Sequence, residues 1–404
     1  MNKDLSNIDR ILNSALAPKG WIDTLPLLQL FNERIDQIGI SKNQAIKIMD
    51  IETKSFDAFM QGGSTKIDFL TIIKLATFLE IAPSIFIDKF LSKVYEENNL
   101  TIERTKVRNH IVKHFDLDSL RNSGFIETVN DFEHIERKIL EFFGYTSIFQ
   151  YKSNIEMPVY SKGKVSSNEK SLKFWVNMAY ATFEKIYNPN EFDRQGLIKV
   201  FPSLRAYSLN VENGLLQIFK LLFKLGVTVV FIPKMYKNLH VRAATFCIND
   251  KPCIAITNYK DFYPTLWFSL FHELYHVLYE WDEIVESEGS AHISAGMSTG
   301  TIDEDAANAF AARYLFDDEK MELVKPFIYD RAYVAKVARG YNVHESIVYG
   351  IYTYKYASQD NKLFARFKDC LIDPKPAIKG FVPSKYEKFE PIIDITKITK
   401  SLIN

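Results

Sequence analysis

Apolar residues recur at helical spacing over most of this chain, and only one short stretch has the pattern of strands. The N-terminal part divides into five short helices separated by Gly, Ser or Pro, at residues 25–38, 42–49, 53–61, 67–79 and 83–94. Two longer helices are predicted at residues 131–144 and 169–187. The pattern therefore predicts a mainly α chain with a small β-sheet, an α+β fold.

The predicted strands are confined to residues 227–257. Residues 227–232 form an apolar, β-branched run that is typical of a buried strand. Residues 243–248 and 252–257 flank Asn249 and Asp250, a pair that favours the tight turn of a hairpin. Cys247 and Cys253 lie in this hairpin at a spacing that matches no usual zinc pattern, so we expect them to be small strand residues.

The order of these elements suggests five segments. Residues 1–22 are an N-terminal extension, 23–95 a five-helix module, 96–210 a helical connecting region, 211–373 a domain that contains the strands, and 374–404 a C-terminal tail. Residues 160–170 are rich in Ser and Gly and predict a hinge, and residues 334–349 predict two helices joined by a turn. Because the tail contains Pro374, Pro376 and Pro383, it is predicted to be an extended surface segment.

Composition narrows the function classes. The 404 residues have a formal net charge of +0, so no overall charge favours nucleic acid or an acidic membrane. Three Cys provide no disulfide framework. The first ten residues are polar and lack the apolar region of a secretory signal, and no apolar run reaches membrane-spanning length. We therefore expect a cytoplasmic protein with no membrane partner.

Residues 272–276, His-Glu-Leu-Tyr-His, form an H-E-x-x-H motif inside an apolar run at residues 266–279. On a helix, His272 and His276 would lie one turn apart on one face and could hold one Zn²⁺. Glu273 would then lie beside the metal and take a proton from water. The alternative is a buried helix with two incidental histidines. Buried histidines need polar partners, and a shared metal would supply one.

A zinc site of this type needs a third protein ligand, and residues 303–312 offer candidates on a strongly predicted helix. Asp303, Glu304 and Asp305 begin this segment, where acids also stabilise a helix N-terminus without any ligand role. Glu304 and Asn308 fall on the same face, one turn apart.

The two segments together resemble the ImmA/IrrE family of metallopeptidases, which joins H-E-x-x-H to a following E-x-x-A-N-x-F-A helix. Residues 304–311 fit this second pattern at every fixed position. The resemblance implies a zincin-like domain in which His272, His276 and Glu304 hold zinc and Glu273 is the catalytic base, while Asn308 packs beside a ligand. Such sites also accept Mn²⁺ or Fe²⁺. One departure is Tyr275, where the family commonly has Gly, and it puts substrate access in doubt.

The N-terminal module resembles Xre-type helix-turn-helix domains through residues 40–62 and 73–83. The resemblance implies that Thr53, Lys54 and Asp57 face DNA bases and that Lys42 and Lys47 lie near phosphates. However, nine acids and eight bases lie between residues 23 and 93, which is a poor charge balance for DNA. A module for dimerisation or partner binding is therefore the alternative.

Other polar residues have weaker claims to a role. His110 and His114 share the spacing of a metal pair but lack a neighbouring Glu, so we interpret them as surface histidines. The group that would stabilise the oxyanion is not assigned, and the candidates are His292, Tyr341, His344 and Tyr349.

The resemblances lead to one main functional hypothesis and one alternative. The first is a zinc-dependent peptidase that cleaves a regulatory protein such as a repressor, fused to a module that binds double-stranded DNA or a partner. Such a protein would regulate genes of a stress response or a mobile element, and it could act as a homodimer. The alternative is a transcriptional regulator or antitoxin without proteolysis, in which zinc is structural or sensory.

Overall fold

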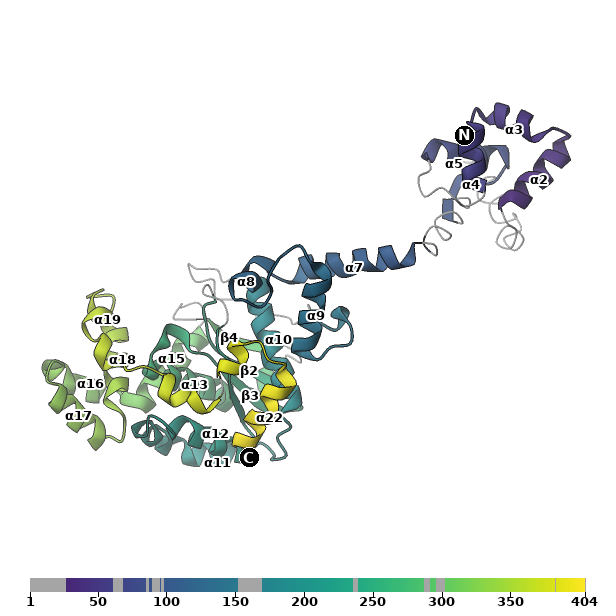
Figure 1. Cartoon of the computed structure of the whole chain (residues 1–404). Coiled ribbons are helices and arrows are strands. Elements are labelled where there is room, and N and C mark those ends of the chain that lie inside the picture. The colour runs from purple at the N-terminus through teal and green to yellow at the C-terminus, as the bar shows by residue number, and fades with distance from the viewer. Residues whose placement is uncertain are drawn as a thin grey trace, which may run out of the picture. The chain divides into compact units, whose positions relative to one another are not determined.

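The computed structural model describes residues 27–60, 68–84, 87–88, 95, 98–151, 169–234, 239–286, 291–295, 302–381 and 383–403. The chain forms two compact units, Met1–Lys106 and Val107–Asn404. Mainly helical structure with one small sheet confirms the predicted fold class. Figure 1 shows the helices and strands of both units.

The first unit contains four described helices, α2 (Leu27–Ile38), α3 (Lys42–Met49), α4 (Thr53–Met60) and α5 (Phe69–Phe78). Ser41 caps α3, and Gln44 completes a capping box. Asp50 adopts a left-handed conformation after α3, and α4 begins three residues later. A small core around Phe31, Phe56 and Leu75 holds these helices together. The predicted fifth helix, 83–94, lies largely outside the described residues.

The second unit begins with helices that contribute residues to its hydrophobic core. They are α7 (Asn99–His114, which starts in the first unit), α8 (Leu117–Asn122), α9 (Phe132–Phe143), α10 (Glu169–Lys185), α11 (Arg194–Val200) and α12 (Gly214–Lys224). Helix α9 lies one residue inside the predicted bounds at each end, because Asp131 caps its start and Gly144, at φ 72°, ends it. Nearly all of the predicted hinge at residues 160–170 lies outside the described residues.

The sheet has four strands in the order β1-β3-β2-β4. They are β1 (Thr228–Phe231), β2 (Val241–Ile248), β3 (Lys251–Ile256) and β4 (Ala291–Ala295). Strands β2 and β3 form the predicted hairpin, and Asn249 and Asp250 turn it with φ angles of 52° and 57°. The register between β2 and β4 shifts between Val241 and Ala243, so a bulge places Arg242 out of the regular alternation.

Helix α13 (Tyr263–Tyr279) carries the H-E-x-x-H motif and packs against β2, β3, α15 (Ile302–Phe316) and α18 (Glu345–Tyr356). Pro264 lies in its first turn, where a missing N–H costs nothing. Gly350 of α18 comes so close to α13 that an added Cβ would lie 2.6 Å from Cβ of Pro264. The predicted pair of helices in residues 334–349 is also present, as α17 (Arg331–Gly340) and α18.

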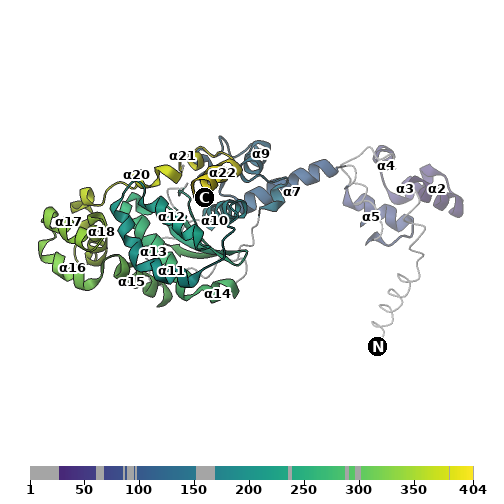
Figure 2. The ribbon, with the colours of Figure 1, turned by 90° about the horizontal axis from the view of Figure 1, so that it is seen from below.

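Smaller helices surround this arrangement. Figure 2 shows α16 (Asp318–Val324), α17 and α18 grouped at one end of the second unit, with α14 (Trp281–Glu286) apart from them. None of the helices in the described part of the chain is both long enough and apolar enough to cross a membrane.

The C-terminal segment corrects one prediction. The described residues of the segment 374–404 are not extended; they form α20 (Lys375–Ile378), α21 (Pro383–Glu387) and α22 (Ile392–Ile403). The prolines that suggested an extended segment stand at or just before the starts of short helices, where a missing N–H costs nothing. Helix α22 packs against α9, α10 and α12 (Figure 1) and buries Ile392, Ile395 and Ile403.

One hydrophobic core joins residues from the connecting region, the strand-containing domain and the C-terminal segment. Phe142, Trp175, Trp267 and Ile395 all belong to it. The sheet and α13 are therefore supported on one side by helices that are distant in sequence, which fixes the helix that carries the motif.

Replacing Ile395 with Ala tests this role of α22. Ile395 is 0% exposed, so the variant should lose about 2–5 kcal/mol of unfolding free energy through lost burial and a residual cavity. Urea unfolding would measure the change. Ile393→Ala is the matched control, because Ile393 on the same helix is 48% exposed and its truncation should cost less than about 0.5 kcal/mol. Equal losses in the two variants would contradict the packing of α22.

Candidate metal centre

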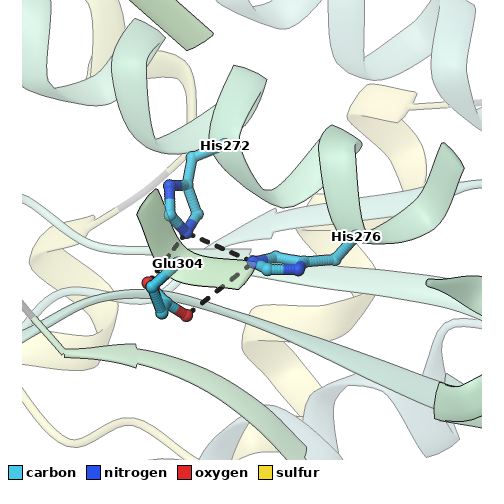
Figure 3. Close-up of side chains that lie close together, drawn as sticks. All are labelled: His272, His276 and Glu304. Carbon is cyan, nitrogen blue, oxygen red and sulfur yellow. Dashed lines mark hydrogen bonds and ion pairs between the residues drawn. The ribbon is translucent and has the colours of Figure 1, made fainter. Parts of the chain in front are cut away.

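Helix α13 presents His272 and His276 on one face because they are four positions apart, about one helical turn. Both side chains are completely buried, and Glu273 between them is buried too. Glu304 comes from the start of α15, the helix that packs along α13. Figure 3 shows these three side chains, His272, His276 and Glu304, pointing toward one another.

The potential ligand atoms lie at the separations that one small ion requires. His272 Nε2 lies 3.2 Å from His276 Nε2 and 3.2 Å from Glu304 Oε2, and His276 Nε2 lies 3.9 Å from Glu304 Oε1. One donor atom from each residue lies within 4.8 Å of the others. Ligand atoms about 2.0–2.1 Å from a tetrahedral zinc ion would be separated by roughly 3.3 Å, so this set of two imidazoles and one carboxylate fits zinc.

The outer nitrogen of each histidine is held by a different residue. Asn308 Oδ1 lies 3.1 Å from His272 Nδ1, and Glu280 Oε2 lies 2.5 Å from His276 Nδ1. When each Nδ1–H donates to its oxygen partner, each Nε2 keeps a lone pair for a metal. Both rings are thus oriented with Nε2 toward Glu304, which is the arrangement that metal-binding histidines need.

Arg242 adds a buried positive charge beside His272. It is 2% exposed, and its Nη2 lies 3.1 Å from Nδ1 and 3.3 Å from Nε2 of His272. Its Nη1 donates to Asn308 Oδ1 at 3.3 Å. Burial, followed by the charge of Arg242, lowers the pKa of His272 to about 3, although Glu304 opposes this shift. His272 is therefore neutral near pH 7, the form that can bind a metal.

Glu273 faces the sheet rather than solvent. Thr245 of β2 donates its hydroxyl hydrogen to Glu273 Oε2 at 2.7 Å. This bond fixes one carboxylate oxygen, and the neighbouring position on α13 keeps the group beside the two histidines. A positioned carboxylate next to a metal site can accept a proton from an attacking water.

Tyr275, the departure from the family pattern, joins a group of aromatic rings. Its ring stacks on Tyr279 at 4.9 Å and contacts Phe310 of α15 at 5.5 Å. Phe310 and Tyr279, with Phe201 and Tyr314, line a separate pocket at this end of α13. The phenol thus packs into the contact between α13 and α15.

The remaining sequence candidates are placed elsewhere. His344 caps α18 by accepting from the Ser346 N–H, and Tyr349 is buried with its ring 5.3 Å from Phe367. Tyr341 lies near Phe316, at 6.0 Å between ring centres. His292 lies on β4 opposite Thr245. The backbone of His292 is thus paired with Thr245, the residue that contacts Glu273. The side chain of His292 lies outside the described part of the chain.

The histidine and cysteine pairs outside the motif have structural surroundings. His110 and His114 are half-buried rather than surface residues, with ring centres 4.4 Å apart. Burial, followed by His110 and nearby lysines, lowers the pKa of His114 to about 4. Cys247 and Cys253 lie in β2 and β3 as predicted, and burial raises the pKa of the Cys253 thiol.

The residues assigned to DNA in the first unit are largely exposed. Three of them are exposed: Lys47, Thr53 and Lys54. Lys42, in contrast, forms an ion pair with Asp57 at 2.6 Å. Two residues that were expected to face the same DNA therefore also face each other.

Sequence reasoning missed Arg242, Thr245 and Glu280. Arg242 and Thr245 lie in the predicted hairpin strand, but no local pattern points from that strand to the motif. Glu280 follows His276 at helical spacing, so its i, i+4 position was a signal that could have been used.

Comparison with known families agrees with this site. Residues 223–349 match the family model described as the IrrE N-terminal-like domain, a metallopeptidase family. The match runs from the end of α12 into α18 and includes both motif segments. It supports assigning this part of the chain to the ImmA/IrrE family. Searches of curated proteins and of solved structures gave no match.

Metal content of a Glu304→Ala variant tests the third ligand. We expect about one zinc per wild-type chain after loading, and at least about tenfold weaker binding in the variant, because a neutral methyl replaces one of three protein ligands. Elemental analysis after dialysis against a chelator series would measure it. Asp305→Ala, the exposed acid next along α15, should retain the metal. Metal binding that is weakened equally by both changes would rule out a specific role for Glu304.

Proposed function

We propose that this chain is a zinc-dependent peptidase that cleaves a regulatory protein and carries an N-terminal helix-turn-helix module for DNA or a partner. The single observation that carries the peptidase part is the convergence of His272, His276 and Glu304 next to Glu273. The family match at residues 223–349 supports the same chemistry. The substrate class rests on the family resemblance alone, and the cytoplasm is the site of action that we propose.

In the proposed reaction, zinc would supply a Lewis acid that polarises the scissile carbonyl and makes a water more acidic. Glu273 accepts the proton of the attacking water and delivers it to the leaving amine. Thr245 holds Glu273 in the required orientation, and Asn308 and Glu280 orient the two histidines. Since burial, and after it the charge of Arg242, keeps His272 neutral, protonation does not compete with metal binding near pH 7.

A Glu273→Gln variant separates catalysis from a structural or sensory metal. Gln cannot accept the proton, so peptide cleavage should fall by about 10²–10⁴-fold while zinc content is unchanged. A proteome-derived peptide library, read by mass spectrometry, gives the cleavage rates without knowledge of the natural substrate. Glu283→Gln, at an exposed position on α14, is the matched control. Equal cleavage by wild type and Glu273→Gln would refute the role of Glu273 as the base. A zinc-loaded wild type that cleaves no peptide would favour the alternative of a regulator with a structural or sensory zinc.

The proposal for the first unit is supported by its local geometry. Helices α3 and α4 are separated by three residues, 50–52, the spacing of a helix-turn-helix. Lys47 and Lys54 are exposed on these helices. The ion pair of Lys42 with Asp57 removes one positive charge from this surface. DNA affinity is therefore expected to be weak and sensitive to salt.

Asp57→Asn should strengthen DNA binding by the full-length protein. The change removes a negative charge and releases Lys42, so one further phosphate contact should make the slope of log K against log salt more negative by about 0.9. Fluorescence anisotropy with mixed-sequence duplexes at several salt concentrations would measure this. Asp36→Asn, at an exposed position on α2, controls for the change in net charge. If neither protein binds any duplex at low salt, the module serves a protein partner instead.

A further inference from the structure

A small pocket adjoins the metal centre along the same face of α13. It is lined by Arg242 of β2, by Thr265 and Phe268 of α13, and by Gly350 and Tyr354 of α18. Phe268 precedes His272 by one helical turn, so the pocket continues directly from the first histidine. Arg242 belongs to both sites, since it contacts His272 and lines the pocket.

Most of the pocket wall is apolar, but its charged groups are all of one sign. Arg242 and Lys260 line it together with two tyrosines, Tyr259 and Tyr354. No Asp or Glu lines it among the residues that the structure describes. The guanidinium carbon of Arg242 lies 5.3 Å from the centre of the Phe268 ring, and Lys260 Nζ lies 5.1 Å from that of Phe364. The buried Arg242 and the exposed Lys260 thus line one largely apolar wall.

Arg242 also has unused donor capacity. Its Nη1 and Nη2 contact Asn308 and His272, but its buried Nε has no hydrogen-bond partner among the described residues. A buried donor without a partner costs stability, so its retention requires an explanation. The bulge in β2 is the feature that takes Arg242 out of the regular alternation of the strand.

The charge balance favours an anion in this pocket. The buried guanidinium has Glu304 and Glu273 as its nearby negative charges. In the proposed function Glu304 shares its charge with a divalent cation, which leaves Arg242 with less compensation. Lys260 adds a second positive charge to the pocket wall. Partial burial of its side chain, and then the charge of Arg242, lower the pKa of Lys260. A bound carboxylate would neutralise this excess.

The size of the cavity limits the ligand. About 50 Å³ of the pocket is open to the centres of water-sized groups, so it admits a ligand group of several heavy atoms rather than a single water. A carboxylate on one or two methylene groups has this size. A basic side chain carries the wrong charge for a wall that contains Arg242 and Lys260.

We propose that this pocket binds a substrate carboxylate on a short aliphatic stem, next to the scissile bond, through Arg242 and Lys260. The carboxylate can come from a Glu or Asp side chain or from the chain terminus of a peptide. This proposal rests on the proposed function, because the metal centre places the substrate.

Zinc-anchored probes test the pocket without turnover. Three probes have the form HONHCO–CH₂–CO–X–NH₂, where X is Glu, Gln or Leu. Two further probes carry Gly at X, one with a free C-terminal carboxylate and one with an amidated C-terminus. Calorimetry on the zinc-loaded full-length protein gives each dissociation constant. The Glu probe should bind about tenfold or more tightly than the Gln probe, since hydrogen bonds to charged groups contribute that much. If the only preference is for the Gly probe with a free terminus over its amide, the carboxylate that the pocket binds is the C-terminal one of a peptide.

Two variants assign the preference to the pocket. Lys260→Met, at an exposed position, should reduce the Glu-over-Gln ratio several-fold while zinc content is retained. Lys336→Met, an exposed lysine on α17, should leave the ratio unchanged. Equal binding of all carboxylate and amide pairs would overturn the carboxylate pocket while leaving the metal centre intact. If no probe binds, or if the protein takes up no zinc, the proposed function itself fails and the pocket proposal falls with it.

Discussion

The metal centre requires the buried ring of His272 to stay neutral, with its Nε2 directed toward the other ligands, although the positive charge of Arg242 lies against the ring. Burial alone disfavours an imidazolium, and the guanidinium of Arg242 disfavours it further. Asn308 accepts from both groups, which fixes the ring relative to the guanidinium. Nε2 of His272 then faces His276 and Glu304, at 3.2 Å from each. The remaining contacts at the site preserve this geometry.

Those parts of the fold and site that depend on helical periodicity could be predicted from the sequence. The spacing of His272 and His276 fixes their common face on any α-helix, and Glu304 and Asn308 follow the same rule on α15. The hairpin could be predicted because Asn249 and Asp250 tolerate the left-handed conformation that its turn requires. The C-terminal segment was misinterpreted because its prolines were given more weight than the helical spacing of Ile392, Ile395 and Ile403.

The contacts between α13 and β2 could not be predicted from local patterns. Arg242 and His272 are 30 residues apart, as Thr245 and Glu273 are 28 apart, and the pairing depends on the register of the sheet. A shift of one residue would exchange the two faces of the strand. The bulge at Arg242 makes such a shift locally, and no residue type in Val241–Ala243 signals it. Only the assembled sheet shows which β2 side chains meet the helix.

Retaining Arg242 in the core has an energetic cost that the fold does not need to bear. Removing a guanidinium from water is strongly unfavourable unless its charge and donors are compensated, and an apolar residue would pack against Phe268 without that cost. The compensation that exists comes from residues of the metal centre, Asn308, Glu273 and Glu304. Arg242 is therefore stabilised mainly by the groups that it helps to arrange. Local departures from good packing rules tend to occur at functional sites, and here the departure joins the metal centre to the adjoining pocket.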